Sequence, residues 1–128
     1  MSFVKMNGRK VYQYATTYLP QVIKTALEKC GRSIKDVDMF LFHQANEKML
    51  QAIANRVAEE FEMPHMDFQN KIPLTIHTLG NTSVATIPTM MDMILRDKMK
   101  GYQINDHDLV VMASVGAGMH CNALVYQF

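Results

Sequence analysis

Two short, unbroken apolar runs constrain the fold of this chain more than any other feature. Residues 39–42 read Met-Phe-Leu-Phe, and residues 109–113 read Leu-Val-Val-Met-Ala. A strand that is apolar at every position is typical of a sheet covered on both faces, as in parallel α/β proteins. Stretches with helical periodicity separate these two runs, so the sequence predicts strands that alternate with helices.

The predicted order of elements is β-α-β-α-β-α-β-β. We expect strands at residues 2–6, 39–42, 73–76 and 109–113 and a last one ending at Tyr126, and helices at residues 11–30, 49–61 and 83–99. Alternation implies crossover connections, and the tight turn before the last strand makes that strand antiparallel to its neighbour. The sequence therefore predicts an α/β fold with a mixed, mostly parallel five-stranded sheet, formed by a single domain over residues 1–128.

Local signals mark several boundaries of these elements. Asn46 is a suitable N-cap for the second helix, and Gly31 is a natural stop for the first. Ser33 and Asp36 have the spacing of a small capped turn. Pro20 interrupts the stripe of the first helix and removes a backbone donor, so we expect a kink or break there.

Composition excludes several classes of protein. Thirteen Lys and Arg against twelve Asp and Glu leave a formal charge of +1, so no broad attraction to nucleic acid or anionic membranes is expected. No apolar run approaches the roughly 18 residues of a membrane helix, and the N-terminus lacks the apolar region of a signal peptide. We expect a soluble cytoplasmic protein.

Cysteine and histidine usage does not favour a metal centre. Cys30 and Cys121 make neither a disulfide framework nor a four-ligand zinc site. The remaining histidines outside position 43 form no closely spaced pair on one predicted helix; they are His65, His77, His107 and His120. No metal site is therefore expected.

Three loops carry the side chains most suited to chemistry. Residues 43–46 read His-Gln-Ala-Asn, residues 80–83 read Gly-Asn-Thr-Ser, and residues 116–118 read Gly-Ala-Gly. All three are expected at the carboxyl edge of the sheet, where α/β proteins usually bind ligands. A neutral His43 imidazole and the Asn81 amide could both donate hydrogen bonds to a developing oxyanion. The glycines of residues 116–118 would let backbone N–H groups approach a carbonyl closely.

Taken one at a time, these loops have plainer interpretations. His43 could be a hydrogen-bonded structural residue, and Gly80-Asn81 could be a turn with a helix cap. Residues 116–118 could be an ordinary hairpin turn, and they lack the strand-to-helix context of a dinucleotide fingerprint.

In combination, the three loops closely resemble the β-ketoacyl-acyl-carrier-protein synthase III family. The resemblance rests on Phe-His-Gln-Ala-Asn at residues 42–46, Gly-Asn-Thr-Ser-Val-Ala-Thr-Ile-Pro at residues 80–88, and Gly-Ala-Gly before the closing strand. The opening Met-Asn-Gly-Arg-Lys-Val-Tyr at residues 6–12 is similar to the family's Met-x-Gly-x-x-Val-Phe segment. The resemblance covers almost the whole chain, and the part of the enzyme that it matches is the C-terminal half.

The resemblance implies a fold and a set of residue roles. Family members have the thiolase-like fold, with two βαβαβαββ halves stacked in five layers, usually as homodimers. They use a Cys-His-Asn triad, in which His43 and Asn81 match the histidine and asparagine. The loop of Gly116, Ala117 and Gly118 matches a segment whose backbone N–H helps to form the oxyanion hole.

The implied reaction condenses an acyl-CoA starter with malonyl-acyl-carrier protein in fatty acid synthesis. The acyl group first moves to the cysteine, and His43 and Asn81 then stabilise the enolate formed as the malonyl group loses CO2. The resemblance implies no cofactor beyond these substrates. Lys48 stands where many relatives have an arginine implicated in docking the carrier protein, and it lacks the bidentate fork of arginine.

The sequence also departs from the family pattern. The nucleophilic cysteine belongs to the family's N-terminal half, and neither Cys30 nor Cys121 has the predicted helix N-terminus that would lower a thiol pKa. The stretch between His43 and Asn81 is longer than expected, and residues 119–122 lack the usual Thr-Trp-Gly. We expect a partner half that bears the cysteine, and no condensing activity from this chain alone.

Two other functions remain open from the sequence. The chain could be half of another thiolase-like acyltransferase, of the polyketide or starter-transferring type, or a non-catalytic subunit that binds carrier protein. Half of a five-layered fold would also expose the apolar face that normally meets the other half, so self-association into a dimer is expected.

Overall fold

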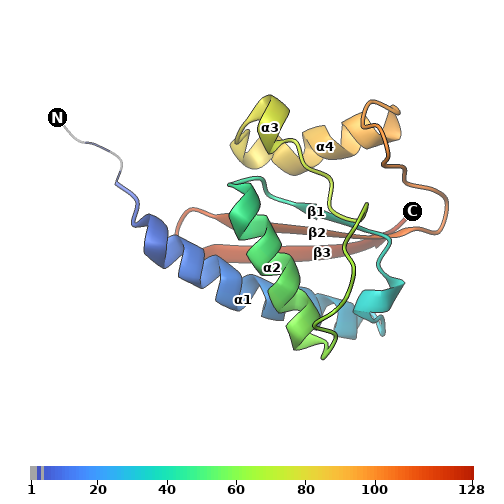
Figure 1. The fold of residues 1–128 in the computed structure, drawn as a ribbon, viewed down its shortest axis with the longest axis horizontal. Helices are drawn as coiled ribbons and strands as arrows, with labels where there is room; N and C mark the ends of the chain where they lie inside the picture. The colour runs from blue at the N-terminus through green and yellow to red at the C-terminus, as the bar shows by residue number, and fades with distance from the viewer. Residues whose placement is uncertain (1–2, 4) are drawn as a thin grey trace.

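The computed structural model describes residue 3 and residues 5–128 and has an α/β fold with helices on both faces of one sheet (Figure 1). Its elements are α1 (Gly8–Lys29), η1 (Ile34–Asp36), β1 (Met39–Phe42), α2 (Glu47–Glu60), α3 (Ile76–Leu79), η2 (Ser83–Ala85), α4 (Thr86–Leu95), β2 (Leu109–Gly116) and β3 (His120–Gln127). The strands lie in the order β1-β2-β3. β1 and β2 are parallel, and β3 is antiparallel to β2, as predicted.

Successive residues of β1 and β2 serve two separate cores, which explains why both strands are apolar throughout. The core beneath α1 and α2 takes Phe40, Phe42, Val111 and Ala113 from the sheet. The core beneath α4 takes Met39, Leu41 and Val110, which pack with Met90 and Ile94. Side chains on opposite faces of one strand are thus both removed from water. Figure 1 shows α1 and α2 on one face of the sheet and α4 on the other.

The predicted caps are confirmed. The Asn46 side chain accepts a hydrogen bond from the Met49 N–H at 2.8 Å and so starts α2. Gly31 follows α1 with φ of 65°, a left-handed conformation that ends the helix without a steric penalty. Ser33 and Asp36 form a capping box around η1.

The predicted number of strands is wrong: the described residues form a sheet of three strands, not five. Of the expected strand at residues 2–6, Ser2 and Val4 lie outside the described residues, and positions 3, 5 and 6 belong to no strand. The expected strand at residues 73–76 is replaced by an irregular segment that enters α3. Pro73 has no N–H to give to a ladder, and the Gln44 side chain binds the polar backbone groups of this segment.

Two helix boundaries also differ from expectation. α1 runs through the buried Pro20 without a break, since its apolar stripe packs against α2 and β3 along its length. The helix predicted over residues 83–99 is divided into η2 and α4 and ends at Leu95. Asp97 then adopts φ of 54°, which a continuing right-handed helix does not allow.

The β2–β3 hairpin ends in the glycine loop predicted from sequence, although β2 extends to Gly116 itself. Gly118 has φ of 77°, and a Cβ atom at this position would lie 3.2 Å from the His120 ring. The turn therefore requires glycine there. In the part of the chain that is described, no helix is both long and apolar enough to cross a membrane.

Candidate active site

His43 is the first residue beyond β1, at the carboxyl edge of the sheet. Its backbone N–H donates to the Ala113 carbonyl of β2 at 3.0 Å, so the parallel ladder fixes the point from which the side chain projects. The residue is half-buried. This location agrees with the predicted position of the loop.

Asn81 lies in the loop that joins α3 to η2. Gly80 precedes it with φ of 68°, and the Asn81 side-chain oxygen accepts a hydrogen bond from the Ser83 N–H at 2.9 Å. This bond holds the amide in a local turn and occupies its oxygen. The exposed Asn81 NH2 group is therefore the part of the side chain that remains to bind a ligand.

The two loops meet at Ser83. Burial lowers the pKa of His43, and the Ser83 backbone, as a hydrogen-bond partner of the imidazole, opposes this by raising it. The structure thus brings His43 to the residue that also anchors Asn81. The sequence predicted a neutral imidazole from the nearby helix N-terminus, but burial is the larger cause.

His43 is expected to titrate below about 6.5, the usual value for an exposed imidazole. Because its folded pKa is lowered, the unfolded chain binds more protons between the two pKa values. The contribution of His43 to stability therefore falls as the pH falls through that window. Histidine Cε1–H resonances followed by NMR test this, with His43→Gln to assign the signal. An apparent pKa at or above 6.5 would contradict the buried imidazole.

The loop of Gly116, Ala117 and Gly118 lies at the same edge of the sheet, three residues beyond Ala113 on β2. All three residues are exposed. Among the described residues, no hydrogen bond joins this loop to the side chains of His43 or Asn81. The loop is therefore accessible from solvent at this edge.

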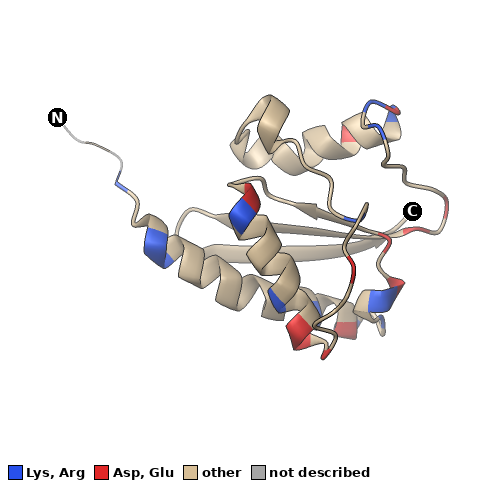
Figure 2. Cartoon of the chain, in the orientation of Figure 1, with Lys and Arg blue, Asp and Glu red and all other residues tan. Residues whose placement is uncertain are grey.

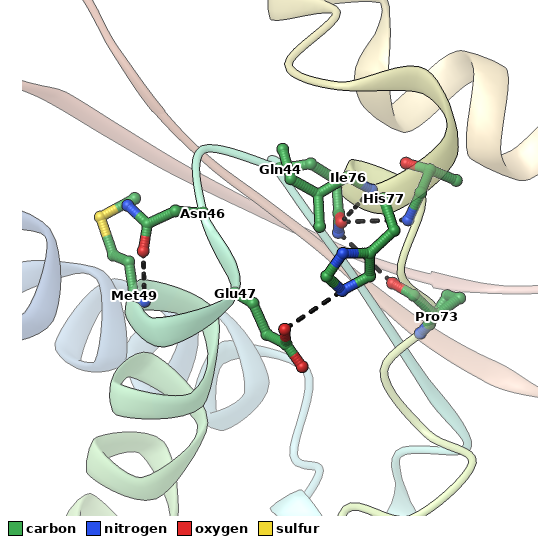
Figure 3. Close-up of polar contacts among 8 residues, drawn as sticks. Gln44, Asn46, Glu47, Met49, Pro73, Ile76 and His77 are labelled. Carbon is green, nitrogen blue, oxygen red and sulfur yellow. Dashed lines mark hydrogen bonds and ion pairs between the residues drawn. The ribbon is translucent and has the colours of Figure 1, made fainter.

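The first turn of α2 carries two charged side chains at this edge. Glu47 and Lys48 are both exposed, and Figure 2 shows basic and acidic segments side by side at the start of this helix. A Glu47 carboxylate oxygen lies 3.1 Å from His77 Nε2 of α3 (Figure 3). From Leu74 to Met91 the sequence has no Lys, Arg, Asp or Glu. The segment from Leu74 to Met91 therefore adds no Lys, Arg, Asp or Glu beside α2.

Gln44 was given no role from the sequence, but it is the most extensively hydrogen-bonded side chain near the site. It is 0% exposed and lies between the end of β1 and the segment that enters α3 (Figure 3). Its Nε2 donates to the Phe42 and Pro73 carbonyls, and its Oε1 accepts from the N–H groups of Thr75 and Ile76. A glutamine at the end of an apolar strand is the only sequence signal of this role.

Comparison with known proteins identifies the family. A family model described as "3-Oxoacyl-[acyl-carrier-protein (ACP)] synthase III C terminal" matches residues 27–128. The chain belongs to this family. The matched range includes all three loops of the synthase III motif, so it confirms the resemblance seen in the sequence.

Individual synthase III proteins align with nearly the whole chain. The chain is 36% identical over 123 residues to "Beta-ketoacyl-[acyl-carrier-protein] synthase III" of Prochlorococcus marinus, covering 96% of this chain and 33% of that protein. A synthase III of Lactobacillus delbrueckii is 37% identical over 115 residues, with 90% and 32% covered. The chain thus spans about a third of the length of these relatives.

The fold agrees with solved structures of the family. The 3-oxoacyl-[acyl-carrier-protein] synthase III of Aquifex aeolicus superposes with a TM-score of 0.78 at 28% identity, covering 98% of this chain and 37% of that one. The thiolase-like α/β fold predicted from the sequence is therefore confirmed, apart from the number of strands.

The two cysteines of the chain lie at the end of α1 and in β3. Cys30 is the residue that follows the last turn of α1, and it is exposed. Burial raises the pKa of Cys121 in β3, and a hydrogen bond with Tyr14 lowers it by a smaller amount. Among the described residues, no group of three or more His, Cys, Asp or Glu is placed to hold a metal ion.

Proposed function

We propose that residues 1–128 act as the C-terminal catalytic half of a 3-oxoacyl-[acyl-carrier-protein] synthase III in cytoplasmic fatty acid biosynthesis. The observation that carries the proposal is the meeting of both loops at Ser83. The Ser83 backbone raises the pKa of the nearby His43 imidazole, and the Ser83 N–H donates to the Asn81 Oδ1. Two uncharged polar side chains beside one residue suit the stabilisation of a single developing oxyanion.

In the proposed first stage, an acyl group moves from coenzyme A to a cysteine. The cysteine sulfur attacks the thioester carbonyl, a new carbon–sulfur bond forms, and the coenzyme A thiol leaves. Cys30 follows the end of α1 and Cys121 lies within β3, so neither is at the start of a helix, and the proposal assigns the thiol to a separate cysteine-bearing half.

In the proposed second stage, malonyl-acyl-carrier protein loses CO2. The bond to the carboxylate breaks, and its electron pair moves onto the thioester oxygen, where His43 and Asn81 donate hydrogen bonds. The enolate carbon then attacks the acyl-cysteine, and backbone N–H groups of residues 116–118 stabilise the tetrahedral oxyanion. The cysteine leaves as a thiolate that takes up a proton. No cofactor is required, because decarboxylation itself supplies the carbanion.

Product analysis tests this proposal. The native protein that carries this chain is incubated with acyl-CoA and malonyl-acyl-carrier protein, and the carrier-bound product is identified by mass spectrometry. Synthase III activity gives a 3-oxoacyl thioester, two carbons longer than the starter. Acyl transfer without decarboxylation would instead indicate a starter-transferring enzyme, and carrier binding without any reaction would indicate a binding subunit.

Lys48 is proposed to attract the anionic carrier protein. It is exposed on the first turn of α2, beside the edge where His43 projects. We expect Lys48→Glu to weaken carrier binding about tenfold, mainly through a slower association rate at low salt. Lys35→Glu, at an exposed position of η1 before β1, is the matched control and should change binding less than twofold. Equal binding by both variants in a titration would remove Lys48 from the interface.

Exposed apolar side chains support the proposal that other chains cover this half. Val84 is 92% exposed in η2, and Leu124 and Tyr126 of β3 are about half exposed. Apolar surface of this kind favours association with a protein partner. We propose that the cysteine-bearing half and a second copy, in a homodimer, bury part of it.

A further inference from the structure

Gln44 differs from every other polar side chain near the candidate site in being completely enclosed and completely satisfied. It is 0% exposed, and its amide makes four hydrogen bonds of 3.1 to 3.3 Å to backbone groups. An apolar side chain of similar volume would fill the same space without needing any partner. The role of the buried amide is therefore to link the backbone groups to which it is hydrogen-bonded.

One end of this connection is the start of α3. The N-cap residue Thr75 supplies no side-chain hydrogen bond, and the first N–H groups of a helix have no partner inside it. Gln44 Oε1 accepts from the N–H groups of Thr75 and Ile76 at 3.1 and 3.3 Å. A residue from the β1–α2 loop thus caps the short helix that leads, through Gly80, to Asn81.

The other end is the strand that carries His43. Gln44 Nε2 donates to the Phe42 carbonyl at 3.2 Å and to the Pro73 carbonyl at 3.3 Å. Phe42 and Gln44 flank His43, so this bond fixes the backbone on both sides of the imidazole. A single amide therefore joins the His43 loop to the segment that sets the start of the Asn81 loop.

We propose that Gln44 is a positioning residue that sets the separation of His43 and Asn81, an inference that rests on the proposed function. A second link between the same segments, the Glu47–His77 ion pair, is exposed on both sides. Exposed ion pairs hold geometry weakly. The buried amide is therefore the link that maintains the geometry of the pair.

Two substitutions test this inference in the native protein. Gln44→Leu keeps the volume and removes all four hydrogen bonds. Gln44→Glu keeps the shape, but a carboxylate cannot donate to the Phe42 and Pro73 carbonyls, and protonation restores one donor. Glu47→Gln, which removes the exposed ion pair, is the matched control and should leave decarboxylation within twofold of the native rate.

We expect Gln44→Leu to slow malonyl decarboxylation about ten- to hundredfold, because small displacements of paired donors are costly. Acyl transfer from coenzyme A to the cysteine should stay within twofold. The rate of Gln44→Glu relative to native should rise as the pH falls, whereas that of Gln44→Leu should not. Equal loss of both half-reactions, or an unchanged decarboxylation rate in folded Gln44→Leu, would overturn the inference.

Amide hydrogen exchange separates this inference from the proposed function. Gln44→Leu should accelerate exchange at Thr75 and Ile76 at least tenfold, whether or not the protein decarboxylates malonyl thioesters. Unchanged protection of these amides would overturn the inference on its own. A native protein without decarboxylation but with faster exchange in the variant would contradict the proposed function and support the link made by Gln44.

Discussion

Replacing either His43 or Asn81 with alanine is expected to slow malonyl decarboxylation by about 100- to 1,000-fold, the usual cost of removing one oxyanion donor. Each change removes a side chain that the proposal directs at the thioester oxygen. Neither side chain belongs to the buried core, since His43 is half-buried and Asn81 is exposed. The loss should therefore fall on the reaction and not on folding. Release of labelled CO2 from malonyl-acyl-carrier protein measures it.

Controls distinguish this result from a general disturbance. His65→Ala replaces an exposed histidine in the loop after α2 and should leave CO2 release unchanged. The thermal midpoints of both alanine variants should lie within a few degrees of the native value. CO2 release near the native rate in both variants would refute the roles given to His43 and Asn81.

Phe40→Ala is expected to destabilise the protein by about 3–5 kcal/mol, the usual cost of deleting a buried aromatic ring. Phe40 is 0% exposed on β1 and faces the core formed with α1 and α2. Its ring centroid lies 5.7 Å from those of both Phe42 and Phe68. Alanine would leave a cavity where three rings now pack. Chemical denaturation followed by circular dichroism gives the free energy of unfolding.

The matched control lies on the same sheet. Leu124→Ala in β3 removes an apolar side chain that is 56% exposed, so we expect a loss below about 1 kcal/mol when other chains do not cover it. A Phe40→Ala variant no less stable than Leu124→Ala would show that the core is not centred on β1.

Much of the fold can be predicted because its signals are local. An unbroken apolar run can be satisfied only between two layers, and β1 lies between α2 and α4 for that reason. Asn46 and Gly31 act within one turn of their own helices, so their roles follow from the sequence alone.

The sequence-based predictions of secondary structure are wrong where a contact with a distant part of the chain determines the conformation. Residues 73–76 have the composition of a short strand, but the Gln44 amide binds their backbone groups and starts α3 instead. Pro20 would break an isolated helix, whereas packing against the sheet and α2 carries α1 through it. Neither contact has a signal within the segment that it changes.

In the candidate site, too, the features with local signals can be predicted and those set by distant contacts cannot. His43 and Asn81 can be picked out because each lies in a recognisable loop at a predicted strand or helix end. That both meet at Ser83, and that Gln44 joins their supporting segments, depends on residues about 30 to 40 positions apart. Burial of the Gln44 amide could not be foreseen, since glutamine is usually exposed.

His43 and Asn81 are proposed to act on the same oxygen, and a double-mutant cycle measures whether they do. CO2 release is measured for the native protein, the two alanine variants and the double variant His43→Ala/Asn81→Ala. Residues that act as a unit are strongly non-additive, so the double variant should lose far less than the product of the two single losses. Single losses that multiply in full would show that the two side chains act independently, and would contradict a shared oxyanion site.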